Sequence, residues 1–217
     1  MATNLSEIEL VFGAVAIGVG SPLNAMQLLW INLLTDVVPG VALALEPPEP
    51  DVLDRPPRDP NEPILGPAQW KRIGFESGVM ASGALASYVY GLRRYGAGAQ
   101  ASTCGFMSLT LAQLLHALSC RSPDRSLLEG TQPPANGYLT AGLAVCFGLQ
   151  ALAAFLPPLR GLLGLGPIGG LDALAIGLGA AVPFIVNEAT KPGRATVAVS
   201  DEAGETVLAP IVAEAPA

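Results

Sequence analysis

The stretch that decides the fold is Q-L-L-W-I-N-L-L-T-D-V-V-P-G, residues Gln27 to Gly40. It lies within an apolar run from about Asn24 to Leu45 that is long enough to cross a bilayer as a helix. Asn32, Thr35 and Asp36 stand at i, i+3 and i+4, so a helix places an amide, a hydroxyl and a carboxylate on one face. A charged side chain at the centre of a membrane helix costs roughly 2.5–3.5 kcal/mol on insertion scales. Asp36 therefore predicts a functional site inside a membrane protein.

The composition of the whole chain agrees with a membrane protein. Of 217 residues, 51% are hydrophobic and 13% are charged, whereas soluble domains have roughly 25% charged residues. The formal net charge is −7, and the 11 Lys and Arg residues form no basic stripe. These features exclude nucleic acid as a partner and make the lipid bilayer the expected one.

The apolar runs predict an all-α, polytopic transmembrane helical bundle of about six spans, the first of them incomplete. Gly74 and Gly78 form G-x-x-x-G, which permits close helix contact. The expected spans are Asn4 to Gly20, Asn24 to Leu45, Trp70 to Leu92, Thr103 to Cys120, Tyr138 to Leu156 and Leu171 to Val186.

Two segments outside the spans have a different character. Residues 46–69 are charged and rich in proline, which favours an extended, exposed loop. Residues 189–217 are acidic and lack periodicity, which predicts a disordered tail behind a transmembrane domain of residues 1–188.

A second polar face complements the first. Asn4 and Glu7 stand at i and i+3, and neither their span nor that of Asp36 contains a basic residue, so the two acids need protons or a cation. Oxygen donors suit hard cations such as Ca²⁺, and Pro39 frees backbone carbonyls that can join them. For Asn32 and Thr35 alone, hydrogen bonds between helices remain an alternative.

Other side chains with metal or proton chemistry give weaker signals. His116 lies three residues after Gln113 and is expected to pack or to form a hydrogen bond, while Glu76 is expected to face loop or headgroup water. The cysteines have no C-x-x-C spacing and are expected to be small core residues: Cys104, Cys120 and Cys146.

Gln27 to Gly40, followed by E-P-P-E-P-D-V-L-D-R-P-P-R-D-P-N-E-P-I-L (Glu46 to Leu65), closely resembles P-type cation pumps of the calcium-ATPase type. The first part is similar to their sixth transmembrane helix and the second to the cytoplasmic loop that leads to the seventh. N-L-S-E (Asn4 to Glu7) is similar to part of the fifth helix, so the other spans would be helices seven to ten. The resemblance covers about residues 1–190 and is most specific in the first 65.

The resemblance implies a set of ligands for the transported ion: Asn4, Glu7, Asn32, Thr35 and Asp36. In the eighth helix, Gln113 takes the place of a glutamate found in pumps with two calcium sites, which puts a second ion site in doubt. Asn32 favours the calcium branch over the sodium and proton–potassium branches. The expected ion is Ca²⁺, with Mn²⁺ as the alternative.

The family's catalytic motifs, D-K-T-G, T-G-E and G-D-G-x-N-D, do not occur in this sequence. Mg-ATP would therefore act only through domains absent from this chain, and the expected partner is a separate polypeptide with the ATPase head and the first four helices. The alternative is a stand-alone membrane protein or remnant that associates with a full-length pump. The absence of organelle signals fits a bacterial plasma membrane, with loop 46–69 and the tail in the cytoplasm.

Overall fold

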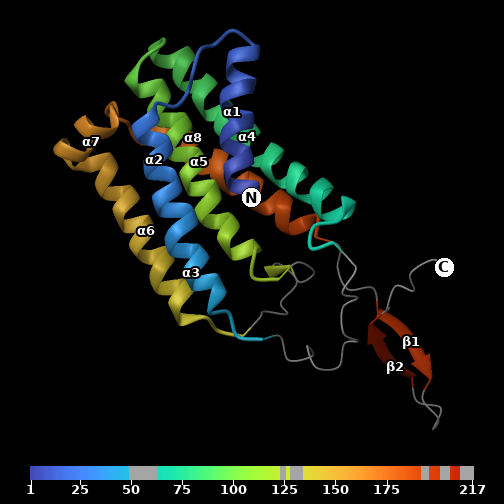
Figure 1. The fold of residues 1–217 in the computed structure, drawn as a ribbon. Coiled ribbons are helices and arrows are strands. Elements are labelled where there is room, and N and C mark those ends of the chain that lie inside the picture. Colours follow the sequence, from blue (N-terminus) through green and yellow to red (C-terminus); the bar gives the residue numbers. More distant parts are fainter. Residues whose placement is uncertain (49–62, 123–125, 128–133, 192–195, 201–205, 211–217) are drawn as a thin grey trace.

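The computed structural model describes residues 1–48, 63–122, 126–127, 134–191, 196–200 and 206–210. A bundle of helices makes up most of this described part, as the sequence predicts (Figure 1). In chain order these are α1 (Ala2–Ala16), α2 (Ala25–Asn32), the π-helical turn η1 (Leu33–Val37), α3 (Val38–Ala44), α4 (Pro67–Tyr95), α5 (Ala99–Ser119), α6 (Gly137–Phe155), α7 (Pro157–Leu163) and α8 (Gly170–Ala189).

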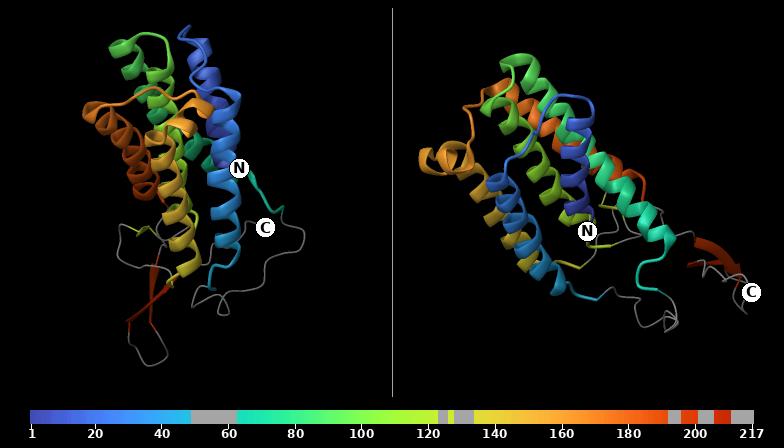
Figure 2. Two further views of the ribbon diagram at one scale, coloured as in Figure 1. Left: turned by 90° about the vertical axis from the view of Figure 1, so that its left-hand side faces the viewer. Right: turned by 45° about the horizontal axis from the view of Figure 1, so that its top comes forward.

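Helices α2 and α3 and the turn η1 form one continuous rod that lies beside α6 (Figure 2). The rod begins with a capping box, in which the Asn24 side chain accepts from the Gln27 N–H and the Gln27 side chain accepts from the Asn24 N–H. This pair satisfies two backbone donors that a helix start leaves without partners. The rod that carries Asn32, Thr35 and Asp36 therefore has a capped N-terminus.

Helix α5 occupies the centre of the bundle and packs against α4, α6, α8 and η1. Most of its residues are buried, including Thr103, Ser108, Thr110 and Gln113. Because protein rather than lipid surrounds α5, it accommodates polar side chains that pair within the bundle.

A close helix crossing joins α4 to α8. A Cβ placed on Gly83 would lie 2.3 Å from the carbonyl oxygen of Gly179, so only glycine allows this approach. By contrast, a Cβ on Gly74 would meet nothing within 4 Å. A Cβ on Gly78 would lie 3.9 Å from Oε2 of Glu9 on α1, so the tight approach of α4 is made at Gly83, beyond the G-x-x-x-G pair.

Within the described residues, three helical segments are long and apolar enough to cross a membrane, namely Ala25–Ala44, Gly137–Phe155 and Gly170–Ala189. Helix α1 has 15 residues, fewer than the roughly 20 that a span needs. Helices α4 and α5 are long but rich in small and hydroxyl side chains. The count of six spans thus stays a prediction.

Two short strands lie in the segment predicted to be a disordered tail, and the disorder of that segment stays a prediction. Strands β1 (Thr196–Ser200) and β2 (Thr206–Pro210) pair antiparallel, with Thr196 opposite Pro210. Their β-branched residues favour this conformation. In the loop predicted at 46–69, residues 49–62 lie outside the described ranges, and α4 begins at Pro67 because proline suits the first position of a helix.

Candidate functional site

The start of α1 lies against the turn η1. The Thr3 hydroxyl is 3.1 Å from Asp36 Oδ1 and 3.0 Å from Asn4 Oδ1, and its single proton serves one of them at a time. This contact brings the two polar faces predicted from the sequence together, because Asn4 belongs to one and Asp36 to the other.

Gln113 joins these faces from α5. Its amide Nε2 lies 3.0 Å from the Thr3 carbonyl oxygen, 3.1 Å from Ser6 Oγ and 3.4 Å from Glu7 Oε1. Glu7 is 7% exposed, and Asp36 lies close enough to act electrostatically on its carboxylate. Glu7 and Asp36 therefore lie in one polar region with Thr3 between their helices.

Asn32 and Thr35 bond mainly to their own helix. The Asn32 amide donates to the Leu28 carbonyl oxygen at 3.1 Å, and the Thr35 hydroxyl donates to the Ile31 carbonyl oxygen at 3.1 Å. Neither contact uses the side-chain oxygen as an acceptor, so Asn32 Oδ1 and the lone pairs of Thr35 Oγ1 remain able to bind a cation. Asn32 also forms a side-chain hydrogen bond with Glu7 of α1, so the alternative of hydrogen bonds between helices applies to Asn32.

The turn η1 has a local cause in Pro39. Proline lacks an N–H, and its ring would clash with the carbonyl four residues earlier, which is that of Thr35. The π-helical turn from Leu33 to Val37 loosens the backbone there. Single π turns inside α-helices are frequent at functional sites.

A cavity of about 540 Å³ lies where α1, the rod and α5 meet. Four of the six predicted ligands line it, namely Asn4, Thr35, Asp36 and Gln113. Glu7 and Asn32 are not among the lining residues. We call this space the polar cavity.

The charges in this region are unbalanced. Among the ion pairs of the described residues, none involves Glu7 or Asp36. The part of the chain that the structure describes also has no group of three or more His, Cys, Asp or Glu side chains around a common metal position. A cation here would therefore need amide, hydroxyl and backbone oxygens or water besides the two carboxylates.

Two contributors were missed by the sequence interpretation. Thr3 contacts Asp36, and Ser6 contacts Gln113. The sequence could have identified them, because Thr3 and Ser6 share a helical face with Glu7 at i, i+3 and i+4. The same spacing identified the polar face of Asp36.

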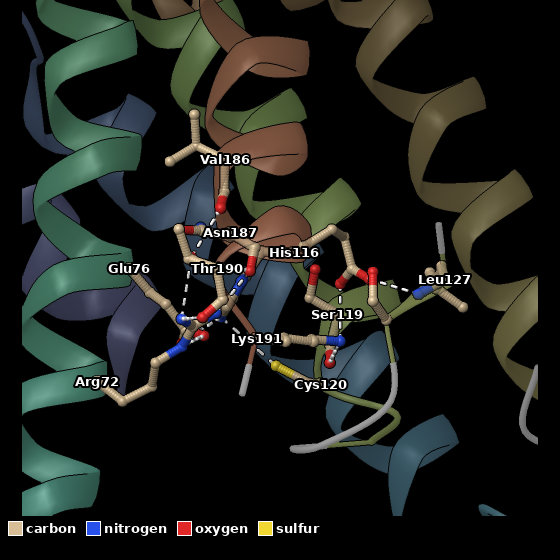
Figure 3. Close-up of polar contacts among 12 residues, drawn as sticks. Arg72, Glu76, His116, Ser119, Cys120, Leu127, Val186, Asn187, Thr190 and Lys191 are labelled. Atoms are coloured by element: carbon tan, nitrogen blue, oxygen red, sulfur yellow. Dashed lines mark hydrogen bonds and ion pairs between the residues drawn. The ribbon is translucent and has the colours of Figure 1, made fainter. Parts of the chain in front are cut away.

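Glu76 and Cys120 also differ from expectation (Figure 3). Instead of facing only loop or headgroup water, Glu76 lines the polar cavity, accepts from Arg72 Nε at 2.6 Å and lies 3.7 Å from His116 Nε2. Cys120 is exposed rather than a core residue; it follows the last residue of α5 and lines the polar cavity. Cys104 and Cys146 are buried as predicted.

Comparison with known proteins places these features in a family. Residues 20–192 match the model described as "Cation transporting ATPase, C-terminus". The calcium-transporting ATPase of Bacillus subtilis is 34% identical over 163 residues, which are 74% of this chain and 18% of that protein. The calcium-transporting ATPase type 2C member 2 of Homo sapiens is 30% identical over 193 residues, 88% of this chain and 20% of that protein.

A third relative is the probable cation-transporting ATPase F of Mycobacterium tuberculosis, 31% identical over 169 residues, 77% of this chain and 18% of that protein. The chain thus spans about one fifth of the length of these relatives. The matched family agrees with the apolar helices and with the two carboxylates that meet between α1 and η1. The chain belongs to the P-type cation-transporting ATPases and corresponds to their C-terminal membrane region.

Proposed function

We propose that this chain supplies ligands for the transported ion of a cation-pumping ATPase, and that the ion is Ca²⁺. The observation that carries the proposal is the approach of Glu7 and Asp36 around Thr3, without an ion pair to either within the described residues. Glu7 is buried and Asp36 is half-buried, and two neighbouring carboxylates that are partly removed from water favour a counter-charge between them. Calcium takes six to eight oxygen ligands, which suits this donor set. Several relatives carry the name calcium-transporting ATPase, which supports the choice of ion.

The proposed ligand set is Asn4, Glu7, Asn32, Thr35, Asp36 and Gln113. The loosened backbone at η1 offers further carbonyl oxygens, as broken membrane helices do in other transporters. Mn²⁺, which is also a hard ion, is the competing candidate.

The proposed membrane arrangement has six spans equivalent to helices five to ten of the pump. Helices α4 and α5 would cross with the three apolar segments, because neighbours shield their polar residues from lipid. Arg72 near the start of α4 bonds to Asn187 and Thr190 at the end of α8, so loop 46–69 and the tail leave from the same side of the bundle. We assign that side to the cytoplasm of a bacterial cell.

ATP hydrolysis lies outside the proposed role of these residues. The phosphorylation, nucleotide-binding and actuator domains, together with the preceding helices, would be supplied by other sequence, either joined to this chain or as a separate polypeptide. Mg-ATP would act through that partner. A remnant without transport function would instead retain no selective cation binding.

The test is a Ca²⁺ binding titration of the full chain in detergent micelles. We expect weak binding that falls by about tenfold or more, equivalent to about 1.4 kcal/mol, in Glu7→Gln and Asp36→Asn. Glu9→Gln is the matched control, because Glu9 also lies on α1 but accepts from Ser77 of α4 at 3.1 Å, whereas Glu7 lies beside Gln113. Competition with Mn²⁺ ranks the two ions. Equal affinities in all variants would contradict the proposal.

A further inference from the structure

His116 and Cys120 form a side-chain pair that the proposed calcium site does not use. They stand four residues apart at the end of α5, so their side chains lie on the same face of the helix. His116 Nε2 and Cys120 Sγ are 3.5 Å apart, and both residues line the polar cavity (Figure 3).

This separation matches two ligands of one metal ion. With a Zn–N distance of roughly 2.0–2.1 Å, a Zn–S distance of roughly 2.3 Å and a tetrahedral angle, the nitrogen and sulfur lie about 3.6 Å apart. The pair in the structure therefore needs almost no rearrangement to chelate an ion.

Glu76 is the nearest further donor. Its Oε2 lies 3.7 Å from His116 Nε2, while its Oε1 accepts from Arg72 Nε at 2.6 Å. Arg72 also donates to the carbonyl oxygens of Asn187 and Thr190, which fixes the side of Glu76 that faces the histidine. The carboxylate is thus aimed at the pair from α4.

His116 is 4% exposed and lines the polar cavity. No group of three or more His, Cys, Asp or Glu side chains in the described residues surrounds one metal position, so the pair offers two side-chain donors. Cavity water or a turned Glu76 would complete the coordination of the ion.

We propose that His116 and Cys120 form a second metal site, for a soft or borderline divalent cation such as Zn²⁺ or Cd²⁺. Thiolate and imidazole prefer such ions, whereas the oxygen donors around Asp36 prefer hard ones. Binding replaces the thiol proton of Cys120, which passes to water, by a metal–sulfur bond. The proposal does not depend on the identity of the transported ion.

The site has a consequence for the rest of the cavity. A divalent ion at His116 and Cys120 adds positive charge to the space that also holds Asp36. Like charges in one cavity repel, so Zn²⁺ would weaken the binding of a hard cation at Asp36 and act as an inhibitor.

The experiment uses the full chain in detergent micelles with Co²⁺ as a spectroscopic probe for the zinc site. We expect a thiolate-to-Co²⁺ charge-transfer band that Zn²⁺ abolishes by competition. The band should be lost in Cys120→Ser and in His116→Gln and retained in Cys146→Ser, the control, whose thiol is buried and donates to the Leu34 carbonyl oxygen. Glu76→Gln should lower the Co²⁺ affinity by a few fold without removing the band.

Thermal unfolding of each variant separates loss of the site from loss of the fold. If Cys120→Ser fails to fold, the wild-type spectrum and His116→Gln decide. No thiolate band in the wild-type chain, an unchanged band in a folded His116→Gln variant, or an equal loss in Cys146→Ser would overturn the proposal. None of these outcomes bears on the calcium titration, so the two proposals fail separately.

Discussion

Replacing Gly83 by alanine tests the close crossing of α4 and α8. The new Cβ would lie 2.3 Å from the Gly179 carbonyl oxygen and 2.6 Å from Cγ of Pro183, and neither atom belongs to a flexible side chain. Ordinary contacts begin at 3.4 Å, so the helices must separate by 3.4 − 2.3 = 1.1 Å at this point. Overpacking of this kind costs about 1–3 kcal/mol. At about 2–4 °C per kcal/mol for a chain of this size, the overpacking should lower Tm by about 2–12 °C.

The matched control is Gly74→Ala on the same helix, where a Cβ meets nothing within 4 Å. Both variants gain about 1 kcal/mol of helix propensity, so the difference between them isolates the clash. A thiol-reactive dye follows unfolding through the buried Cys104 and Cys146, in a Cys120→Ser background that removes the exposed thiol. Equal melting temperatures for the two glycine variants would refute the described crossing.

Four further predictions follow from the site and its surroundings. In a full-length pump, Asp36→Asn should abolish ion-dependent phosphorylation by ATP, and Gln113→Ala should have a smaller effect because it removes no charge. Arg72→Gln should destabilise the chain by about 1–2 kcal/mol, since three hydrogen bonds between α4 and α8 are lost. The exposed neighbour Lys71→Gln should leave the melting temperature unchanged. Pro39→Ala should favour a regular α-helix through the π-helical turn and lower Ca²⁺ affinity in titrations although no side-chain ligand is removed. The purified chain alone should form no acid-stable phosphoenzyme, which labelling with radioactive ATP would reveal.

The helices could be predicted because apolar length is a local property. The second expected span, Asn24 to Leu45, agrees closely with the rod from Ala25 to Ala44. Helix α7 lies between two expected spans, Tyr138 to Leu156 and Leu171 to Val186, and was not predicted because it is too short to cross a membrane. The prolines at 157 and 158 occupy its first turn, where proline is favoured.

Helix periodicity predicted which polar residues share a face of one helix, but it did not predict which helices meet at the site. The spacing of Asn32, Thr35 and Asp36 indicated a polar face, and the structure brings that face against α1. The contribution of Glu76 could not be predicted, because its orientation depends on Arg72 reaching the end of α8, more than a hundred residues away. The pairing of Gly83 with Gly179 is likewise set by which helices cross, and no local spacing encodes it.

The turn η1 weakens the helix at the proposed ion site, and such a weakening would help an ion to bind and leave. In a regular α-helix every carbonyl near Asp36 would be held by the N–H four residues later, and a cation would have to compete with those bonds. Pro39 has no N–H to offer, and the π-helical turn changes the partners of the preceding residues. Backbone oxygens beside Thr35 and Asp36 can therefore turn toward a cation and back without breaking a full set of helical hydrogen bonds. A pump must both bind and release its ion, so a ligand shell built partly on such backbone can change between the two states at a smaller cost in free energy.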